Sequence, residues 1–149
     1  MCSDSSSTAR TFRYEDIALG AKEARDYVIS QEVYDHFLSA FGDRSPIHVD
    51  EDYARACGFE GRVMHGALLN GFLSHYIGMY FPGRLSLLLA VDLRLAKPSY
   101  LGDTIHLEAV VSQKLDASNV VVLDAVFTNV TRDCLVARSR VQVMVRNES

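Results

Sequence analysis

The chain has 149 residues, of which 48% are hydrophobic, and its formal net charge at pH 7 is -4. This length suits one domain with a buried core, and so large an apolar fraction excludes general disorder. The mild negative charge argues against nonspecific nucleic-acid binding, which needs a basic face, and no apolar run reaches the length that spans a membrane.

The N-terminus is polar and rich in serine, with neither the basic stretch nor the apolar stretch of a secretory signal. We therefore expect residues 1–12 to form a disordered tail, residues 13–149 to form one domain, and the protein to be cytoplasmic. Cys2, Cys57 and Cys134 show no metal-site or redox spacing, which favours free thiols in a reducing compartment.

The first half of the domain predicts a strand followed by helices. Residues 24–29 favour a strand, and Ser30 is a candidate N-cap for an amphipathic helix over 31–40 that Gly42 ends. Asp50 is the next candidate N-cap, for a short helix. These signals predict two helices separated by a loop.

The main helix is predicted over 65–80, where apolar residues cover most of its circumference. A helix of this kind must be largely enclosed by other structure. Pro82 and Gly83 follow it and end the helical spacing.

After residue 86 the apolar residues alternate, as is typical of strands. Four successive strands of about 8–11 residues are predicted, joined by short turns that favour antiparallel pairing. The predicted strands begin at residues 86, 105, 120 and 135. The whole order predicts an α+β domain whose curved antiparallel sheet wraps the apolar helix. An apolar sheet face left over in so small a domain predicts a homodimer.

Two stretches combine residue types that can do acid–base chemistry. Residues 42–50 place Asp43 and His48 five positions apart, with Pro46 between them, and residues 63–66 open the apolar helix with a His-Gly pair. An acid, an imidazole and a helix N-terminus are the groups needed to activate water and stabilise an oxyanion.

These stretches resemble the hydratase motif and the central-helix start of the MaoC-like, R-specific enoyl-CoA hydratases. Residues 95–98 and 101–103 are similar to a later strand and turn of that family. The resemblance runs from about Tyr14 to Val145 and implies the hot-dog fold, with a five-stranded antiparallel sheet around a long central helix. It also implies a homodimer or a dimer of dimers in which two sheets join. Ser45 departs from the family, which has asparagine there.

The resemblance further implies a hydro-lyase of fatty acid metabolism that adds water reversibly and syn to a trans-2-enoyl thioester. It assigns Asp43 and His48 to one catalytic water, and leaves open which is the acid. The Gly66 N–H at the helix start is a candidate donor to the thioester oxyanion. The substrate is an acyl-CoA or an acyl carrier protein thioester. We expect no metal, since no metal-binding histidine spacing is present, and no separate cofactor.

Further residues are candidates for substrate binding, through the motif loop, through aromatic contact or through the phosphates of coenzyme A. They are Phe41, Ser45, Pro46, His65, Arg84 and Lys97. Each also has a structural interpretation, such as a core aromatic ring, a helix cap or an ordinary surface charge. The same holds for the catalytic candidates: Asp43 has an interpretation as a turn cap, His48 as a buried histidine and Gly66 as a packing glycine.

Two other functions stay open. A hot-dog thioesterase would use a carboxylate to direct water at the thioester carbonyl, and it would release a free thiol. A noncatalytic module that binds acyl thioesters would keep the pocket and would need neither Asp43 nor His48.

Overall fold

The computed structural model describes residues 8–148, and five strands in this part of the chain form one antiparallel sheet. The strands are β1 (Lys22–Val28), β2 (Ser86–Leu95), β3 (Thr104–Leu115), β4 (Val120–Asn129) and β5 (Cys134–Val145). Their order across the sheet is β1-β3-β4-β5-β2, so β1 and β2 are its two edges. The predicted α+β architecture is confirmed.

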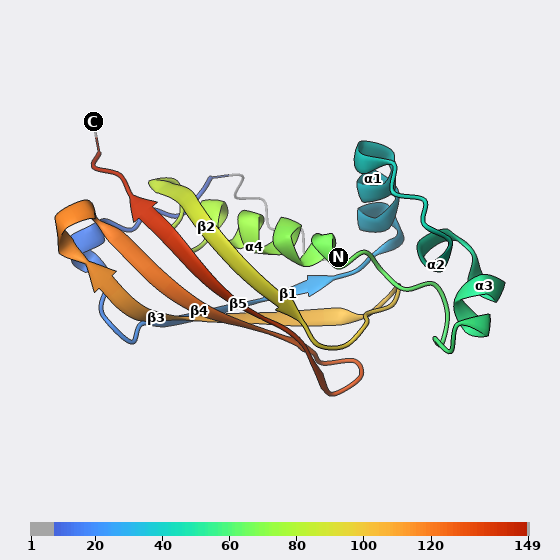
Figure 1. Cartoon of the computed structure of the whole chain (residues 1–149). Coiled ribbons are helices and arrows are strands. Elements are labelled where there is room, and N and C mark those ends of the chain that lie inside the picture. Colours follow the sequence, from blue (N-terminus) through green and yellow to red (C-terminus); the bar gives the residue numbers. More distant parts are fainter. Residues whose placement is uncertain (1–7, 149) are drawn as a thin grey trace.

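The helices of the described residues fall into two groups. They are α1 (Gln31–Phe41), α2 (Pro46–Val49), α3 (Glu51–Ala56) and α4 (Ala67–Met79), with 3-10 turns at Tyr14–Asp16 and Asp116–Ser118. In Figure 1, α4 lies along one face of the curved sheet, whereas α1, α2 and α3 gather beyond one end of it. The catalytic motif predicted from the sequence lies in this second group.

Local signals set the ends of the first helices. The Ser30 hydroxyl accepts the Val33 N–H (3.2 Å), and Gly42 ends α1 in the left-handed conformation with φ 69°. The Asp50 carboxylate accepts the Tyr53 N–H (2.9 Å) at the start of α3. The caps predicted from the sequence are therefore confirmed, because each depends on residues close together in the chain.

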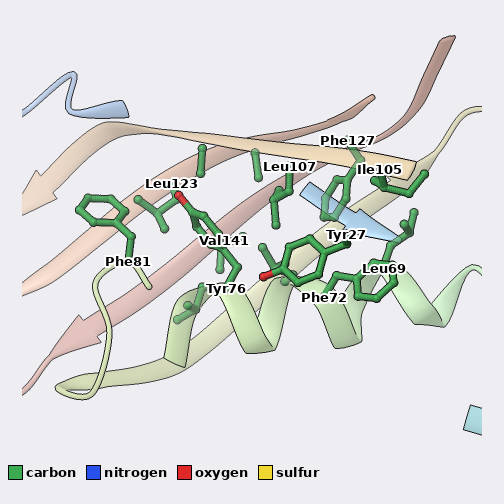
Figure 2. Close-up of a cluster of buried hydrophobic side chains, with 14 of the residues drawn as sticks. Tyr27, Leu69, Phe72, Tyr76, Phe81, Ile105, Leu107, Leu123, Phe127 and Val141 are labelled. Atoms are coloured by element: carbon green, nitrogen blue, oxygen red, sulfur yellow. The ribbon is translucent and has the colours of Figure 1, made fainter. Parts of the chain in front are cut away.

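The core lies between α4 and the sheet. In β3 the alternate residues Ile105, Leu107 and Ala109 are fully buried, and they face the side chains of α4, such as Phe72 and Tyr76 (Figure 2). The helix starts two residues later and ends one residue earlier than predicted. Its burial agrees with its nearly all-round apolar sequence.

The predicted disordered tail is too long. Arg10 donates its backbone N–H to the Met79 carbonyl oxygen (2.9 Å), and the Phe12 ring lies edge-on to Phe81 with ring centroids 5.2 Å apart. The partners lie far along the chain, so local composition could not reveal them. The rest of the predicted tail, residues 1–7, lies outside the described residues.

The edge strand β2 exposes five large apolar side chains, whereas β1 and β3 expose one each, Val28 and Leu115. The five on β2 are Leu87, Leu88, Leu89, Val91 and Leu95. An edge strand has unpaired backbone groups along its outer side, so this row is a natural surface for association.

The described residues include two of the three cysteines. Cys57 and Cys134 are free, whereas Cys2 lies outside the described residues. Among residues 8–148, no helix has the length and apolar character needed to cross a membrane.

Candidate active site

A pocket of about 290 Å³ lies beside the N-terminus of α4. The end of β2 and the helix α2 also contribute residues to its wall. Most of its lining is apolar. The residues that line it are Ile29, His48, Val63, Met64, His65, Gly66, Leu68, Leu69, Leu95, Ala96, Lys97, Pro98, Ser99 and Val136. It offers an apolar chain a place beside a small number of polar groups.

Contacts between neighbouring residues shape the motif loop, residues 42–50. After Gly42 ends α1, the Asp43 carboxylate accepts the Ser45 N–H (3.2 Å), which closes a short turn. Pro46 then begins α2, where its missing N–H costs nothing, and His48 follows in that helix. The sequence therefore brings the acid and the imidazole to the same side of a tight turn.

The neutral form of His48 is held in one tautomer. Its Nδ1 lies 2.6 Å from the Val63 carbonyl oxygen, and because a carbonyl can only accept, Nδ1 carries the hydrogen. The lone pair of neutral His48 is therefore on Nε2, which lies 3.9 Å from Asp43 Oδ2. The His48 side chain is 13% exposed and that of Asp43 is 52% exposed. Two polar groups at this separation can share one water molecule.

Two main-chain contacts fix His48 from behind. The Tyr34 hydroxyl donates to the His48 carbonyl oxygen (2.7 Å), and the Val63 N–H donates to the Ile47 carbonyl oxygen (2.9 Å). Sequence reasoning missed Tyr34. The available signal was its place three residues before Phe37, on the buried face of α1.

His65 supports the loop that carries the acid. Its Nε2 lies 2.8 Å from the Asp43 carbonyl oxygen, so this nitrogen also carries a hydrogen. The ring is nearly buried between Phe37 and His48, with centroids 4.7 and 4.0 Å away. Its Nδ1 has no hydrogen-bond partner among residues 8–148.

Asp43, His48 and His65 are close enough to suggest a cation site, since one candidate ligand atom of each lies within 4.8 Å of the others. The geometry fits a metal poorly. The His65 nitrogen in this group donates to a carbonyl, and a nitrogen that carries a hydrogen has no lone pair for a metal.

Gly66 is the N-cap of α4 and has no need of a left-handed conformation, since its φ is -59°. A Cβ atom here would lie 2.5 Å from Leu95 Cδ1, so glycine allows a close approach at the pocket wall. Within residues 8–148, the Gly66 N–H has no backbone acceptor. A helix N-terminus of this kind can receive a developing negative charge.

The remaining candidates are divided between the pocket and the surface. Lys97 lines the pocket, and the loop residues Ser45 and Pro46 flank the acid. Phe41 is 73% exposed at the end of α1 and does not line the pocket. Arg84 lies just before β2, at the end opposite the pocket, so this chain does not bring it to the site.

Comparisons with known proteins agree with this geometry. The sequence profile of the family described as MaoC like domain matches residues 19–131. An (R)-specific enoyl-CoA hydratase of Rhodospirillum rubrum is 34% identical over 92 residues, which are 62% of this chain and 64% of that protein. A 3-hydroxybutyryl-CoA dehydratase of Methylorubrum extorquens is 29% identical over 104 residues, 70% of this chain and 66% of that protein. The alignments thus span just under two thirds of the length of these curated relatives.

Among solved structures, the unliganded R-hydratase PhaJ1 of Pseudomonas aeruginosa superposes with a TM-score of 0.86 at 28% sequence identity. The superposition covers 94% of this chain and 89% of that chain. The likeness therefore extends over nearly the whole chain.

Proposed function

Because this chain belongs to the MaoC-like domain family and has the hot-dog fold, we propose that it is an (R)-specific enoyl-CoA hydratase. Such a hydro-lyase adds water reversibly to a trans-2-enoyl thioester and forms a 3-hydroxyacyl thioester. The observation that carries the proposal is the pair of His48 Nε2 and Asp43 Oδ2, 3.9 Å apart beside an apolar pocket. Hydration needs an acid and a base on one water, and this pair supplies both.

In the proposed reaction, one water molecule lies between Asp43 and His48. One of these groups, unprotonated, takes a proton from the water as its oxygen attacks C3, and the other, protonated at that step, gives its proton to C2. Each of the two residues is a candidate for either role. Because a single site supplies both additions, the hydroxyl and the proton enter from one face of the double bond.

The thioester oxygen carries negative charge while C2 has the character of an enolate. The Gly66 N–H at the start of α4 is our candidate for its stabilisation. The helix dipole favours the same charge. We propose no metal and no redox cofactor, because the balance of water addition requires neither.

The acyl chain would occupy the apolar pocket, with Lys97 near the coenzyme A phosphates. Ser45, Pro46 and His65 would shape the loop around the reacting atoms. Phe41 stays a candidate for substrate binding at the edge of the site, whereas Arg84 lies at the end of β2 opposite the pocket and has no part in this proposal. We propose coenzyme A as the carrier, with acyl carrier protein as the alternative.

The exposed apolar row of β2 supports a homodimer formed through this edge. The dimer would join two sheets, and two dimers could associate further. A cytoplasmic role in fatty acid metabolism suits a thioester substrate of this kind.

The test follows the loss of conjugated enoyl absorbance when the purified protein meets crotonyl-CoA, with Asp43→Asn and His48→Ala beside it. We expect hydration by the wild type and a loss of about 10²–10⁴-fold in either variant. His36→Ala is the matched control, since His36 is exposed on α1 and outside the pocket. Released free thiol would favour the thioesterase instead. Ligand binding without turnover, unchanged by both variants, would favour a binding module.

A further inference from the structure

A buried carboxylate lies outside the pocket, in the turn between β2 and β3. Asp103 is 2% exposed, and its oxygens accept the Tyr100 N–H (2.8 Å), the Asn129 amide (2.7 Å) and Arg132 Nε (2.9 Å). A buried charge persists only with partners of this kind. These contacts fix the turn that follows β2.

Arg132 makes a second ionic contact in another part of the chain. Its Nη1 donates to the Glu60 carboxylate, and its guanidinium lies over the Tyr100 ring, 4.3 Å from the centroid. The hydrogen bond to Glu60 raises the pKa of Arg132, and that to Asp103 adds to it, against a lowering by burial. One guanidinium therefore fastens the loop before α4 to the turn after β2. We call Arg132, Asp103, Glu60 and Tyr100 the Arg132 clamp.

The two fastened segments meet directly behind His48. Val63 forms an isolated antiparallel bridge with Tyr100, and the Met64 N–H donates to the Ser99 carbonyl oxygen (2.9 Å). On its other side Val63 presents the carbonyl that receives the hydrogen of His48 Nδ1. The clamp thus backs the one acceptor that selects the tautomer of His48.

We propose that Arg132 is a positioning residue for the reaction. By holding the loop of residues 58–62 against the turn of residues 99–103, it keeps the Val63 carbonyl on His48 Nδ1. This leaves His48 Nε2 free to face Asp43. An imidazole that loses its acceptor can carry its hydrogen on Nε2 instead, and that tautomer presents a hydrogen in place of a lone pair to the water and to Asp43. The inference rests on the proposed hydratase function for its kinetic part only.

Arg132→Lys is the central test, since lysine keeps the charge and loses the fork that reaches two carboxylates. We expect kcat with crotonyl-CoA to fall about 10–100-fold while KM stays within about twofold, because a small displacement of a catalytic group has effects of this size. Nitrogen NMR of the histidine rings should show less hydrogen on His48 Nδ1. Arg140→Lys is the matched control: Arg140 Nε lies 3.1 Å from Asp124 on the sheet, away from the pocket.

Glu60→Gln removes only the negative charge of the outer contact, at a side chain that is 69% exposed, and provides a milder variant if Arg132→Lys fails to fold. It should change kcat and the His48 ring in the same direction and by less. A folded Arg132→Lys or Glu60→Gln whose kcat and His48 nitrogens match those of Arg140→Lys would overturn the inference. The ring nitrogens are measured without substrate. An inactive wild type would therefore count against the hydratase, and an unchanged His48 ring would count against the clamp.

Discussion

The two regions of this molecule are held together by different forces. Between α4 and the sheet, large apolar side chains such as Phe127 and Tyr76 are almost completely buried. In the segment of α1, α2 and α3, only Tyr34 and Ala54 are buried, and the segment projects beyond the sheet (Figure 1). There the side chains of the site are placed by hydrogen bonds to single carbonyl oxygens. The body of the protein thus supplies stability, and the projecting segment supplies a geometry that depends on a few polar contacts.

The largest expected effect is on the body. Phe127→Ala removes a fully buried ring from β4, and its cost should be about 3–5 kcal/mol in the free energy of unfolding, measured by urea denaturation. Val126→Ala, at the neighbouring half-buried position, is the matched control and should cost much less. Equal costs at the two positions would show that the body is not held by this core.

The next effect compares two glycines at the same helix. Gly66→Ala places a Cβ 2.5 Å from Leu95 Cδ1 at the pocket wall, whereas Gly71→Ala meets nothing within 4 Å. The Leu95 side chain is 59% exposed and can turn aside, but the added methyl group then lies at the pocket wall beside the proposed oxyanion donor. We therefore expect kcat/KM to fall about tenfold in Gly66→Ala, because a small displacement of the reacting atoms has an effect of this size or larger. Gly71→Ala should keep full activity and gain stability, because alanine favours a helix. Equal activity of the two variants would argue against Gly66 at the reacting atoms.

A smaller effect distinguishes the two regions through the same substitution, tyrosine to phenylalanine, made once in each. Tyr34 and Tyr76 are both buried, and each donates its hydroxyl to a carbonyl oxygen, of His48 at 2.7 Å and of Glu23 at 3.0 Å. Tyr34→Phe and Tyr76→Phe should each cost about 1 kcal/mol of stability. Only Tyr34→Phe should also lower kcat, since only its hydroxyl supports His48, for which we propose a catalytic role. A loss of kcat in both variants would show that the two regions act as one.

The smallest effect is a pH dependence of the body. Burial, and then the charge of Arg25, lower the pKa of His75, whose Nδ1 lies 3.2 Å from the Tyr27 hydroxyl. The unfolded chain therefore binds the proton more readily than the folded protein. Stability is complete above the unfolded pKa of about 6.5 and falls as the pH drops through it. Urea denaturation from pH 8 to 5 should show a shallower fall in His75→Gln. The wild-type slope in that variant would contradict the assignment.

The sequence predicted what depends on neighbours in the chain. The cap at Ser30, the left-handed end at Gly42 and the alternation that buries Ile105 all follow from local chemistry. The pairing of Asp43 with His48 follows from their spacing of five positions and from the resemblance of the residues around them to the hydratase motif. In each case the signal and the structure that it predicts lie within a few residues.

The remaining features depend on contacts between distant parts of the chain. Alternation could not show that β2 is an edge strand, so the exposure of Leu88 and its neighbours follows only from the order of the sheet. The support of His48 by Tyr34 and Val63, and the contacts of Arg132, join segments that sequence periodicity does not relate. The residues that support His48 from other segments therefore could not be predicted from sequence patterns.

The most direct test of the proposed water between Asp43 and His48 is hydration of crotonyl-CoA in D₂O, with analysis of both new centres in the product. The account predicts an (R)-3-hydroxyl group and one deuterium at C2, added to the same face of the double bond. Deuterium on the opposite face or on both faces, or the absence of hydration by the folded protein, would contradict it.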